Sequence, residues 1–301
     1  ITGGASGLGR GLGEAVARAG AKLVVGDIDL VAASALCDEL TRAGKSASAV
    51  HVDVTDAASV ERLVAEAVAL HGRLDYMINN AGIAAGGEFQ EVSADAIRRV
   101  VEIDLLGAAY GTLAAYRQMV GQRSGHIVNV ASMLALFPNP LSAAYVAAKH
   151  GLGGLTQSVA AEAAAYGVSL TLVCPGYIAT NLFKAGTFEG SLRSDDVLKR
   201  IPFRLMDVDI AVARTLEAVL ARRSIAVFPF YGRVLWWIHR FSPSLMAGLL
   251  RLMMRGGLET LAEAGVFDIS EKSQVLENRI AFTTDLAEAV SEADMVIEAV
   301  F

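Results

Sequence analysis

The chain has 301 residues, of which 53% are hydrophobic, and its 26 basic and 32 acidic side chains give a net charge of −6. This composition excludes a disordered, a collagen-like or a disulfide-stapled chain, and the charge argues against a nucleic-acid partner. Cys37 and Cys174 lie far apart, and the five histidines form no metal-ligand grouping. Neither a disulfide framework nor a metal site is therefore predicted.

Both ends of the sequence are expected to be cut. The chain opens on Ile1-Thr2 without an initiator Met and stops in an apolar, strand-like run. A targeting signal ahead of Ile1 would lie outside this sequence. No apolar run has the roughly 18 residues of a membrane-spanning helix, and two unclustered cysteines fit a reducing, cytoplasmic location.

Apolar strand-like runs alternate with longer stretches that carry apolar residues at helical spacing. This alternation predicts an α/β fold, a doubly wound parallel sheet with helices on both faces. The first strand is represented by Ile1-Thr2 alone. Further strands are predicted at 22–26, 47–52, 74–78, 126–130, 169–173 and 224–228, and helices at 9–19, 30–43, 57–71, 94–122, 143–166 and 209–221.

Charge divides the chain into three parts. Residues 1–225 hold 20 basic and 22 acidic side chains, residues 226–256 hold four Arg and no acid, and residues 257–301 hold two basic and ten acidic side chains. Such shifts indicate segments with different surroundings. We predict an α/β domain over 1–225, an apolar basic segment over 226–256 and an acidic fragment over 257–301.

A glycine-rich sequence, Thr2 to Gly9 (TGGASGLG), joins the first strand to the first predicted helix. Its glycines permit a tight turn and let backbone N–H groups approach a pyrophosphate at the helix N-terminus. The spacing is GxxxGxG rather than GxGxxG, and a glycine-rich turn alone is as often only a turn. Its place between a strand and a helix favours a dinucleotide site.

Two acidic residues follow strands in positions that suit a dinucleotide. Asp27 comes directly after the second strand, about 20 residues past the turn, where its carboxylate can bind both ribose hydroxyls and repel a 2′-phosphate. This favours NAD over NADP. Asp53-Val54 ends the third strand, where Asp53 is a loop residue by default and an adenine contact if the turn binds a dinucleotide.

Ser132, Tyr145 and Lys149 form the most informative group. Tyr145 and Lys149 are four residues apart and share one face of a predicted helix. A nearby ammonium stabilises a phenolate, so Lys149 is expected to lower the Tyr145 pKa from its ordinary value of about 10 and make it an acid/base. Ser132, just beyond a strand, is placed to hydrogen-bond a substrate oxygen.

With these residues, positions 1 to about 225 resemble the short-chain dehydrogenase/reductase family. The matching motifs are TGGASGLG at Thr2 to Gly9, Asp27, Asp53-Val54, Asn79-Asn80-Ala81-Gly82, Ser132, Tyr145 with Lys149, and Pro175-Gly176-Tyr177-Ile178-Ala179-Thr180. The resemblance implies a Rossmann fold, a nicotinamide cofactor and hydride transfer at a carbinol or carbonyl carbon. It also implies a homodimer or homotetramer that pairs through helices 94–122 and 143–166.

The resemblance implies a role for each matching residue. Tyr145 would be the acid/base, Lys149 would hold the nicotinamide ribose, Ser132 would orient the substrate, and Ile178 and Thr180 would contact the carboxamide. The expected cofactor-binding residues are Gly3, Ser6, Gly7, Leu8, Gly9, Asp27, Asp53, Val54, Asn80, Ala81, Gly82, Tyr145, Lys149, Pro175, Gly176, Ile178 and Thr180. The expected catalytic residues are Ser132, Tyr145, Lys149 and Asp104.

Asp104 departs from the family pattern. The family has Asn in an NxxG pattern here, where it holds a water in the proton path, and this chain has Asp104-Leu105-Leu106-Gly107. Asp accepts a hydrogen bond from that water but cannot donate as Asn does, and its charge is expected to raise the Lys149 pKa. We expect reduced rather than abolished turnover.

Residues 227–255 combine Trp236, Trp237 and other large apolar residues with four Arg. One reading is a lid or subunit-contact helix over the substrate pocket, and the other is an interfacial membrane helix. Either reading fits an apolar substrate. Apolar residues near the motifs also favour a lipophilic alcohol or ketone; these are Leu134, Leu136, Phe137, Tyr177 and Phe183.

Residues 275–300 resemble part of the NAD-binding domain of 3-hydroxyacyl-CoA dehydrogenases, without its glycine-rich loop. We therefore expect a partial second α/β unit there, or an acidic appendage with a chance likeness.

The sequence predicts an NAD-dependent oxidoreductase, with NADP less favoured, that interconverts a small lipophilic secondary alcohol and a ketone. The alternative is a non-catalytic dinucleotide-binding or membrane-associated protein.

Overall fold

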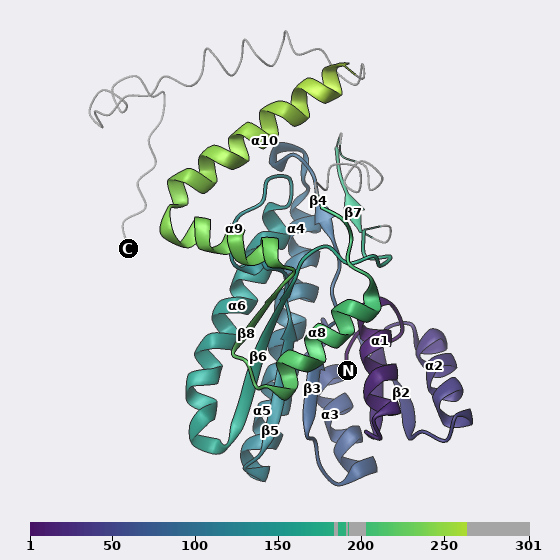
Figure 1. The fold of residues 1–301 in the computed structure, drawn as a ribbon. Coiled ribbons are helices and arrows are strands. Elements are labelled where there is room, and N and C mark those ends of the chain that lie inside the picture. Colours follow the sequence, from purple (N-terminus) through teal and green to yellow (C-terminus); the bar gives the residue numbers. More distant parts are fainter. Residues whose placement is uncertain (184–185, 191, 193–202, 264–301) are drawn as a thin grey trace. The chain divides into compact units, whose positions relative to one another are not determined.

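The computed structural model describes residues 1–183, 186–190, 192 and 203–263, with residues 255–263 described as helical backbone alone. Residues 1–248 form a compact unit that contains the sheet (Figure 1). A second unit begins at Leu249. The predicted acidic fragment lies outside the described residues from residue 264 onward, so its resemblance stays a prediction.

The strands of the central sheet are parallel. β1 (Leu23–Asp27) pairs with β2 (Ala47–His51), and a four-stranded part has the order β3 (Tyr76–Asn79), β5 (Gly125–Val130), β6 (Val168–Pro175) and β8 (Ile225–Phe228). Thr2 forms parallel bridges to both Gly26 and Asn79. The Ile1-Thr2 segment thus lies between β1 and β3, as the prediction of a short first strand requires.

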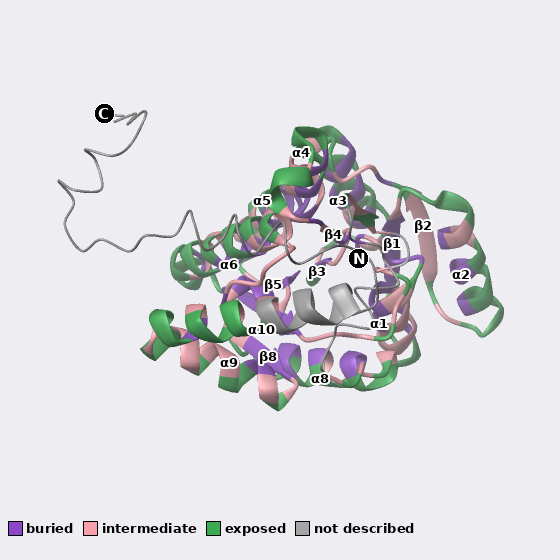
Figure 2. Ribbon diagram, turned by 90° about the horizontal axis from the view of Figure 1, so that it is seen from above, coloured by how far each residue is buried: buried purple, intermediate pink, exposed green. Residues whose placement is uncertain are grey.

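Helices cover both faces of this sheet, so the predicted doubly wound α/β fold is confirmed. Ile127 and Val128 are neighbours in β5 but belong to opposite cores, because successive strand side chains point to opposite faces. Figure 2 shows the strands from above, between the two layers of helices. The helices are α1 (Gly7–Arg18), α2 (Leu30–Arg42), α3 (Ala57–His71), α4 (Ala94–Val101), α5 (Ala108–Gln122), α6 (Ala143–Ala163), α8 (Val208–Leu220), α9 (Phe230–Phe241) and α10 (Pro243–Glu263).

Local sequence fixes where several helices begin. Asp29, Asp56 and Ser93 precede α2, α3 and α4, and their side chains accept hydrogen bonds from Ala32 N, Ala58 N and Ala96 N respectively. These bonds satisfy backbone donors that the first helical turn leaves without partners.

The prediction of one continuous α-helix over 94–122 is wrong at residues 102–107. α4 and α5 are joined by a π-helical turn, Glu102–Gly107, which contains the buried Asp104. A Cβ at Gly107 would lie 2.9 Å from Val54 Cβ, so the turn passes close to the end of the third predicted strand. Apolar periodicity continues through such a turn, which is why the sequence pattern did not separate the helices.

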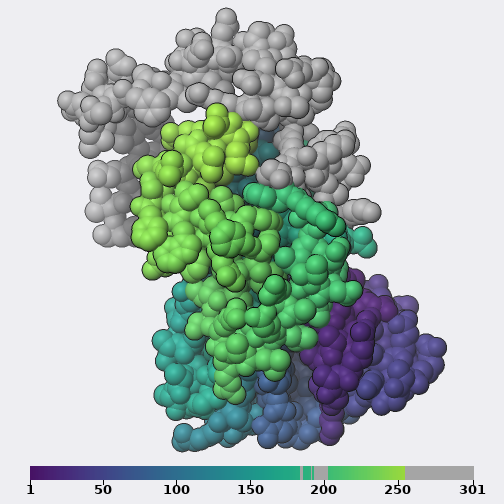
Figure 3. All heavy atoms as spheres, in the orientation of Figure 1, coloured from purple at the N-terminus to yellow at the C-terminus, as the bar shows by residue number. Residues whose placement is uncertain are grey.

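Two further features lie outside the main sheet. The short strands β4 (Ala85–Gly86) and β7 (Thr187–Phe188) pair in parallel and were not predicted. After β8 the chain continues into α9, which lies at the surface (Figure 3). Among the described helices, none has the length and apolar content needed to span a membrane.

Candidate active site

The four residues predicted to be catalytic come together from three elements. Tyr145 and Lys149 lie one turn apart on α6, Ser132 follows β5, and Asp104 lies in the π-helical turn. Lys149 Nζ is 5.4 Å from the centroid of the Tyr145 ring and 3.0 Å from Asp104 Oδ2. Tyr145 is hydrogen-bonded to Ser132, whose Oγ also accepts from Leu134 N at 3.2 Å.

Lys149 and Asp104 form a buried ion pair. Asp104 is 1% exposed and Lys149 is 3% exposed. Asp104 Oδ1 accepts a hydrogen bond from Ile83 N at 2.8 Å, and Lys149 Nζ donates to Val130 O at 3.4 Å. Burial disfavours the ammonium, but the attraction of Asp104 is strong enough to raise the pKa of Lys149, as predicted. Burial also raises the pKa of Asp104, and Lys149 opposes that rise.

The prediction that Lys149 lowers the Tyr145 pKa below its ordinary value is wrong for the protein without a bound cofactor. Burial raises the pKa of Tyr145, and the lowering effect of Lys149 does not overcome it. The negative charge of Asp104 raises the Tyr145 pKa further. The four-residue spacing correctly predicted that the Lys149 ammonium lies close to the Tyr145 ring. It carried no information on how deeply the phenol is buried.

The glycine-rich turn is packed closely against the loop after β3. Gly3 has a φ of +61°, and a Cβ there would lie 2.7 Å from Ala81 Cα. Asn80 Nδ2 donates to Gly3 O at 2.9 Å, and a Cβ at Gly9 would meet both of these groups. Only glycine fits these positions, because the turn packs directly on the Asn80–Gly82 loop. Ser6 precedes α1 and is exposed, Leu8 is buried in the core, and Gly82 lies against Asp104.

The two acidic residues predicted to bind the dinucleotide have different partners. Asp27 accepts hydrogen bonds from Ala5 N at 2.9 Å and from Asp29 N at 3.0 Å, which places its carboxylate beside the glycine-rich turn. Asp53 accepts from Thr55 N and Oγ1, and these bonds lower its pKa. Its neighbour Val54 packs partly into the core. Asp27 is therefore in position for a ribose beside the turn.

The loop after β6 is supported by a residue that sequence reasoning missed. Gly176 N donates to Phe228 O at 2.7 Å, and Tyr177 N donates to the Tyr231 hydroxyl at 3.4 Å. A Cβ at Gly176 would lie 2.5 Å from that hydroxyl. Tyr231 comes from α9, some 55 residues later in the chain, and no local pattern links it to this loop. Pro175 ends β6, and Ile178 bridges Met206.

The same loop reaches the glycine-rich turn, since a Cβ at Gly7 would lie 3.3 Å from Thr180 Cγ2. The turn, Asp27, the Asn80–Gly82 loop and the 175–180 loop thus border one region at the carboxyl ends of the strands, where open α/β sheets bind their ligands. These residues fit an extended dinucleotide. In the described part of the chain, no cluster of His, Cys, Asp or Glu could hold a metal ion.

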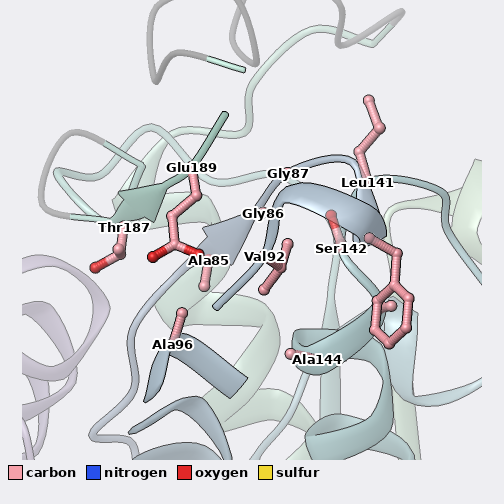
Figure 4. Close-up of a pocket in the computed structure, with 12 residues that line it drawn as sticks. Ala85, Gly86, Gly87, Val92, Ala96, Leu141, Ser142, Ala144, Thr187 and Glu189 are labelled. Carbon is pink, nitrogen blue, oxygen red and sulfur yellow. The ribbon is translucent and has the colours of Figure 1, made fainter. Parts of the chain in front are cut away.

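A small pocket lies beside the first turn of α6, close to Tyr145 along the chain (Figure 4). Leu141 contributes to its wall with a φ of +61°, an uncommon backbone conformation for this residue type. The Glu189 carboxylate bonds Ser93 N at 2.6 Å and Ser93 Oγ at 2.8 Å, which fastens β7 to the start of α4. The lining is Ala85, Gly86, Gly87, Phe89, Val92, Ala96, Leu141, Ser142, Ala143, Ala144, Thr187 and Glu189.

Sequence reasoning did not identify this pocket. Leu134 and Phe137, which it favoured as substrate contacts, are buried, and Leu136 packs against a core cluster. The Tyr177 and Phe183 rings lie 6.0 Å apart. The pocket is mainly apolar because apart from Ser142, Thr187 and Glu189 its lining consists of glycine and hydrophobic side chains.

The chain is similar to several known proteins. The profile of the short chain dehydrogenase family matches residues 1–188. The chain is 37% identical over 182 residues to the mitochondrial borneol dehydrogenase of Lavandula x intermedia, covering 60% of this chain and 68% of that protein. It is 42% identical over 183 residues to the cis-4-hydroxycyclohexanecarboxylate dehydrogenase of Sinomonas cyclohexanicum, covering 60% and 73%. Other relatives are longer, and this chain spans 44% of their length.

The fold is similar to that of a solved short-chain dehydrogenase/reductase from Burkholderia phymatum, determined in complex with NAD. The TM-score is 0.75 at 30% sequence identity, and the match covers 81% of this chain and 93% of the other.

Proposed function

Because this chain belongs to the short-chain dehydrogenase family, we propose that it interconverts a lipophilic secondary alcohol and its ketone with NAD as the preferred cofactor. Membership makes it an NAD(P)-dependent oxidoreductase of alcohols and ketones. The observation that carries the proposal is the grouping of Tyr145, Lys149 and Ser132, with Lys149 against Gly82 in the loop that packs on the glycine-rich turn. The preference for NAD, the residue roles and the substrate class are the proposed parts.

In the proposed reaction Tyr145 moves the proton. During alcohol oxidation the Tyr145 phenolate takes the hydroxyl proton, the carbinol C–H bond breaks, and a carbonyl forms. Ser132 donates a hydrogen bond to the substrate oxygen, and Lys149 stabilises the phenolate by its charge. The bound nicotinamide supplies the hydride acceptor or donor. Ketone reduction runs through the same groups in reverse, and holding the reactants together contributes much of the rate.

Asp27 supports NAD rather than NADP. Both of its carboxylate oxygens already accept backbone N–H bonds, which fix them beside the turn. A carboxylate in this position attracts ribose hydroxyls and repels a 2′-phosphate. We propose that Gly3, Gly7, Gly9 and the Asn80–Gly82 loop bind the rest of the dinucleotide.

The pocket beside α6 supports a lipophilic substrate. As described it has room for about one water molecule, so its support lies in the apolar character of the side chains next to the start of α6, two of which, Ala143 and Ala144, directly precede Tyr145 in the sequence. The names of two relatives identify cyclic secondary alcohols as their substrates. We therefore propose a cyclic or branched secondary alcohol for this chain.

A homo-oligomer is also proposed. Leu106 and Leu113 lie in the π-helical turn and α5 and are 37% and 45% exposed. Apolar side chains on these helices support pairing between copies through them, which sedimentation velocity measures directly.

The Tyr145→Phe variant tests the proposed function. We expect it to retain NAD binding in a fluorescence titration, because the other cofactor-binding residues are intact, and to lose turnover by at least about 10²-fold with a panel of cyclic secondary alcohols. Tyr166→Phe, at an exposed tyrosine just after α6, is the matched control. Turnover that survives Tyr145→Phe would refute the assigned acid/base.

One observation favours the non-catalytic alternative. Asp104 partly neutralises Lys149, and the Tyr145 pKa is raised in the free protein. If the protein binds NAD but turns over no alcohol between pH 7 and 10, and if Asp104→Asn gives it turnover, then it is a dinucleotide-binding protein that the Asp at position 104 has silenced.

A further inference from the structure

One side of α9 exposes a row of large apolar residues. Phe230, Val234, Trp237 and Phe241 are spaced by four, three and four residues, which places them on one face of the helix. Their exposed fractions are 75%, 40%, 50% and 77%. We call this row the apolar stripe; α9 is shown at the edge of the molecule in Figure 2.

The apolar stripe is not the side of α9 that packs against the fold. On the other side Gly232 is buried against Met133 and Val227, and Trp236 packs against a core cluster. The Trp237 ring stacks on Phe241, with ring centroids 5.2 Å apart, and its centroid is 6.0 Å from that of Trp236, so these ring contacts of the stripe are with residues of α9 itself. A helix that is apolar on both sides is expected to be covered on both.

Arginines border the apolar stripe. Arg233 and Arg240 are exposed and seven residues apart, which places both on the same flank of the helix. Arg233 Nε donates to Val227 O at 2.8 Å, which fixes its guanidinium near the start of α9. The chain has a net charge of −6, yet residues 226–256 contain four Arg and no Asp or Glu.

The charge decides between two occupants of the apolar stripe. In a two-fold dimer the same patch faces itself, so Arg233 and Arg240 of each copy would approach those of the other with no local carboxylate to pair them. An anionic bilayer surface meets both requirements. Its phosphates pair with the guanidinium groups, while Phe and Trp rings enter the boundary between headgroups and acyl chains.

We propose that α9 is an interfacial helix that docks the protein on an anionic membrane, with the apolar stripe turned toward the acyl chains and Arg233 and Arg240 at the headgroups. The proposal concerns localisation to a lipid surface and does not depend on the proposed reaction. Tyr231 would then connect the lipid-facing helix to the candidate active site, because it lies on α9 and its hydroxyl contacts the loop at Gly176 and Tyr177.

The test uses the protein's own tryptophans. The chain has two Trp, both on α9, so intrinsic fluorescence reports on this helix alone. We expect the full chain to float with vesicles of phosphatidylcholine and phosphatidylglycerol, and its emission to be quenched when the acyl chains are brominated. Trp237→Phe keeps the apolar surface, so it should retain flotation and lose most of the quenching.

Two double variants separate the electrostatic from the hydrophobic contribution to vesicle binding. Arg233→Gln with Arg240→Gln should weaken binding to the anionic vesicles by roughly 30-fold, since each basic residue near such a surface contributes about fivefold. Trp237→Glu with Phe241→Glu should abolish flotation. Leu220→Glu, which alters a residue 77% exposed on α8, is the matched control and should float like the wild type. Far-ultraviolet circular dichroism and NAD titration check that each variant is folded.

Two results would overturn the proposal. One is the absence of flotation and quenching with anionic vesicles while the protein is folded. The other is a dimer by sedimentation velocity that Trp237→Glu dissociates, with no vesicle binding, which would make the apolar stripe an interface between copies. Equal binding to pure phosphatidylcholine would also contradict the role given to the arginines.

Discussion

The ammonium of Lys149 lies 3.0 Å from a carboxylate oxygen of Asp104, and both side chains are buried within reach of the Tyr145 ring. The cation that should favour the Tyr145 phenolate therefore shares its charge with an anion. The pKa of Tyr145 is accordingly raised, first by burial and further by Asp104. Through this pair, the presence of Asp104 where the family pattern has Asn is expected to change the pH dependence of turnover.

Replacing Asp104 with Asn should speed alcohol oxidation at neutral pH. Removing the negative charge lets Lys149 act fully on Tyr145, which lowers the phenol pKa, so the phenolate forms at lower pH. We expect the acid limb of the kcat/KM profile to move down by about one pH unit and the rate at pH 7 to rise by up to about tenfold. An unchanged profile would show that Asp104 does not tune the phenol.

The control for this experiment is Asp104→Leu, which removes the charge and also the acceptor for Ile83 N. It leaves Lys149 buried without a polar partner from Asp104, and this should cost stability. Both variants remove the charge and only Asn keeps an oxygen for Ile83 N. A shift of the acid limb that both variants show therefore assigns the effect to charge, and a shift seen with Leu alone assigns it to loosened packing.

Asp27→Ser should weaken the discrimination between NAD and NADP. The carboxylate repels a 2′-phosphate, and Ser does not, so the ratio of the two Kd values should fall by about 10- to 100-fold. Isothermal titration with both cofactors measures this ratio. Asp38→Ser, at an exposed residue on α2, serves as the control, and an equal ratio in Asp27→Ser and wild type would contradict the ribose contact.

Gly9→Ala should damage the cofactor site although alanine favours helices. The added methyl would meet Gly3 O and Asn80 Nδ2, so the turn must shift. We expect a loss of about 1–3 kcal/mol in unfolding free energy and at least about tenfold weaker NAD binding.

Gly121→Ala is the matched control, because a Cβ at this α5 position has no neighbour within 4 Å. It should raise the unfolding free energy by up to about 1 kcal/mol and leave NAD binding unchanged. Similar stability changes in the two variants would mean that the turn has room for a side chain.

His126 should make the fold sensitive to acid. It is 2% exposed, and its Nε2 lies 2.8 Å from Thr171 Oγ1, whose hydroxyl donates to Arg223 O. Burial, with the nearby Arg222, lowers the pKa of His126 to about 4. Between pH 6.5 and 4 the unfolded chain binds the proton and the folded chain does not, so stability falls as the pH falls, by about 2–3 kcal/mol.

Urea unfolding at pH 7.5 and pH 4.5 measures this loss. His126→Gln removes the titrating group and should flatten the pH dependence by that amount, whereas His150→Gln, at an exposed histidine of α6, should not. Equal slopes for His126→Gln and wild type would contradict the role of His126.

The sequence alone determined the layered fold and the motifs. Strand and helix periodicity is local, so the order of elements, the glycine-rich turn, Asp27 and the Tyr145–Lys149 pair followed from spacing. The structure confirmed the doubly wound sheet, and the family profile confirmed the predicted family. The place of Ile1-Thr2 between β1 and β3 agrees with the same local pattern.

The tertiary structure decided what depends on burial and on contacts between distant segments. It introduced the π-helical turn that carries Asp104, raised the pKa of Tyr145 where spacing predicted a fall, and brought Tyr231 to the loop at Gly176. It also showed which side of α9 is covered and which is not. These features arise because desolvation and packing depend on the whole surroundings of a side chain, and a periodic pattern records only its neighbours along the chain.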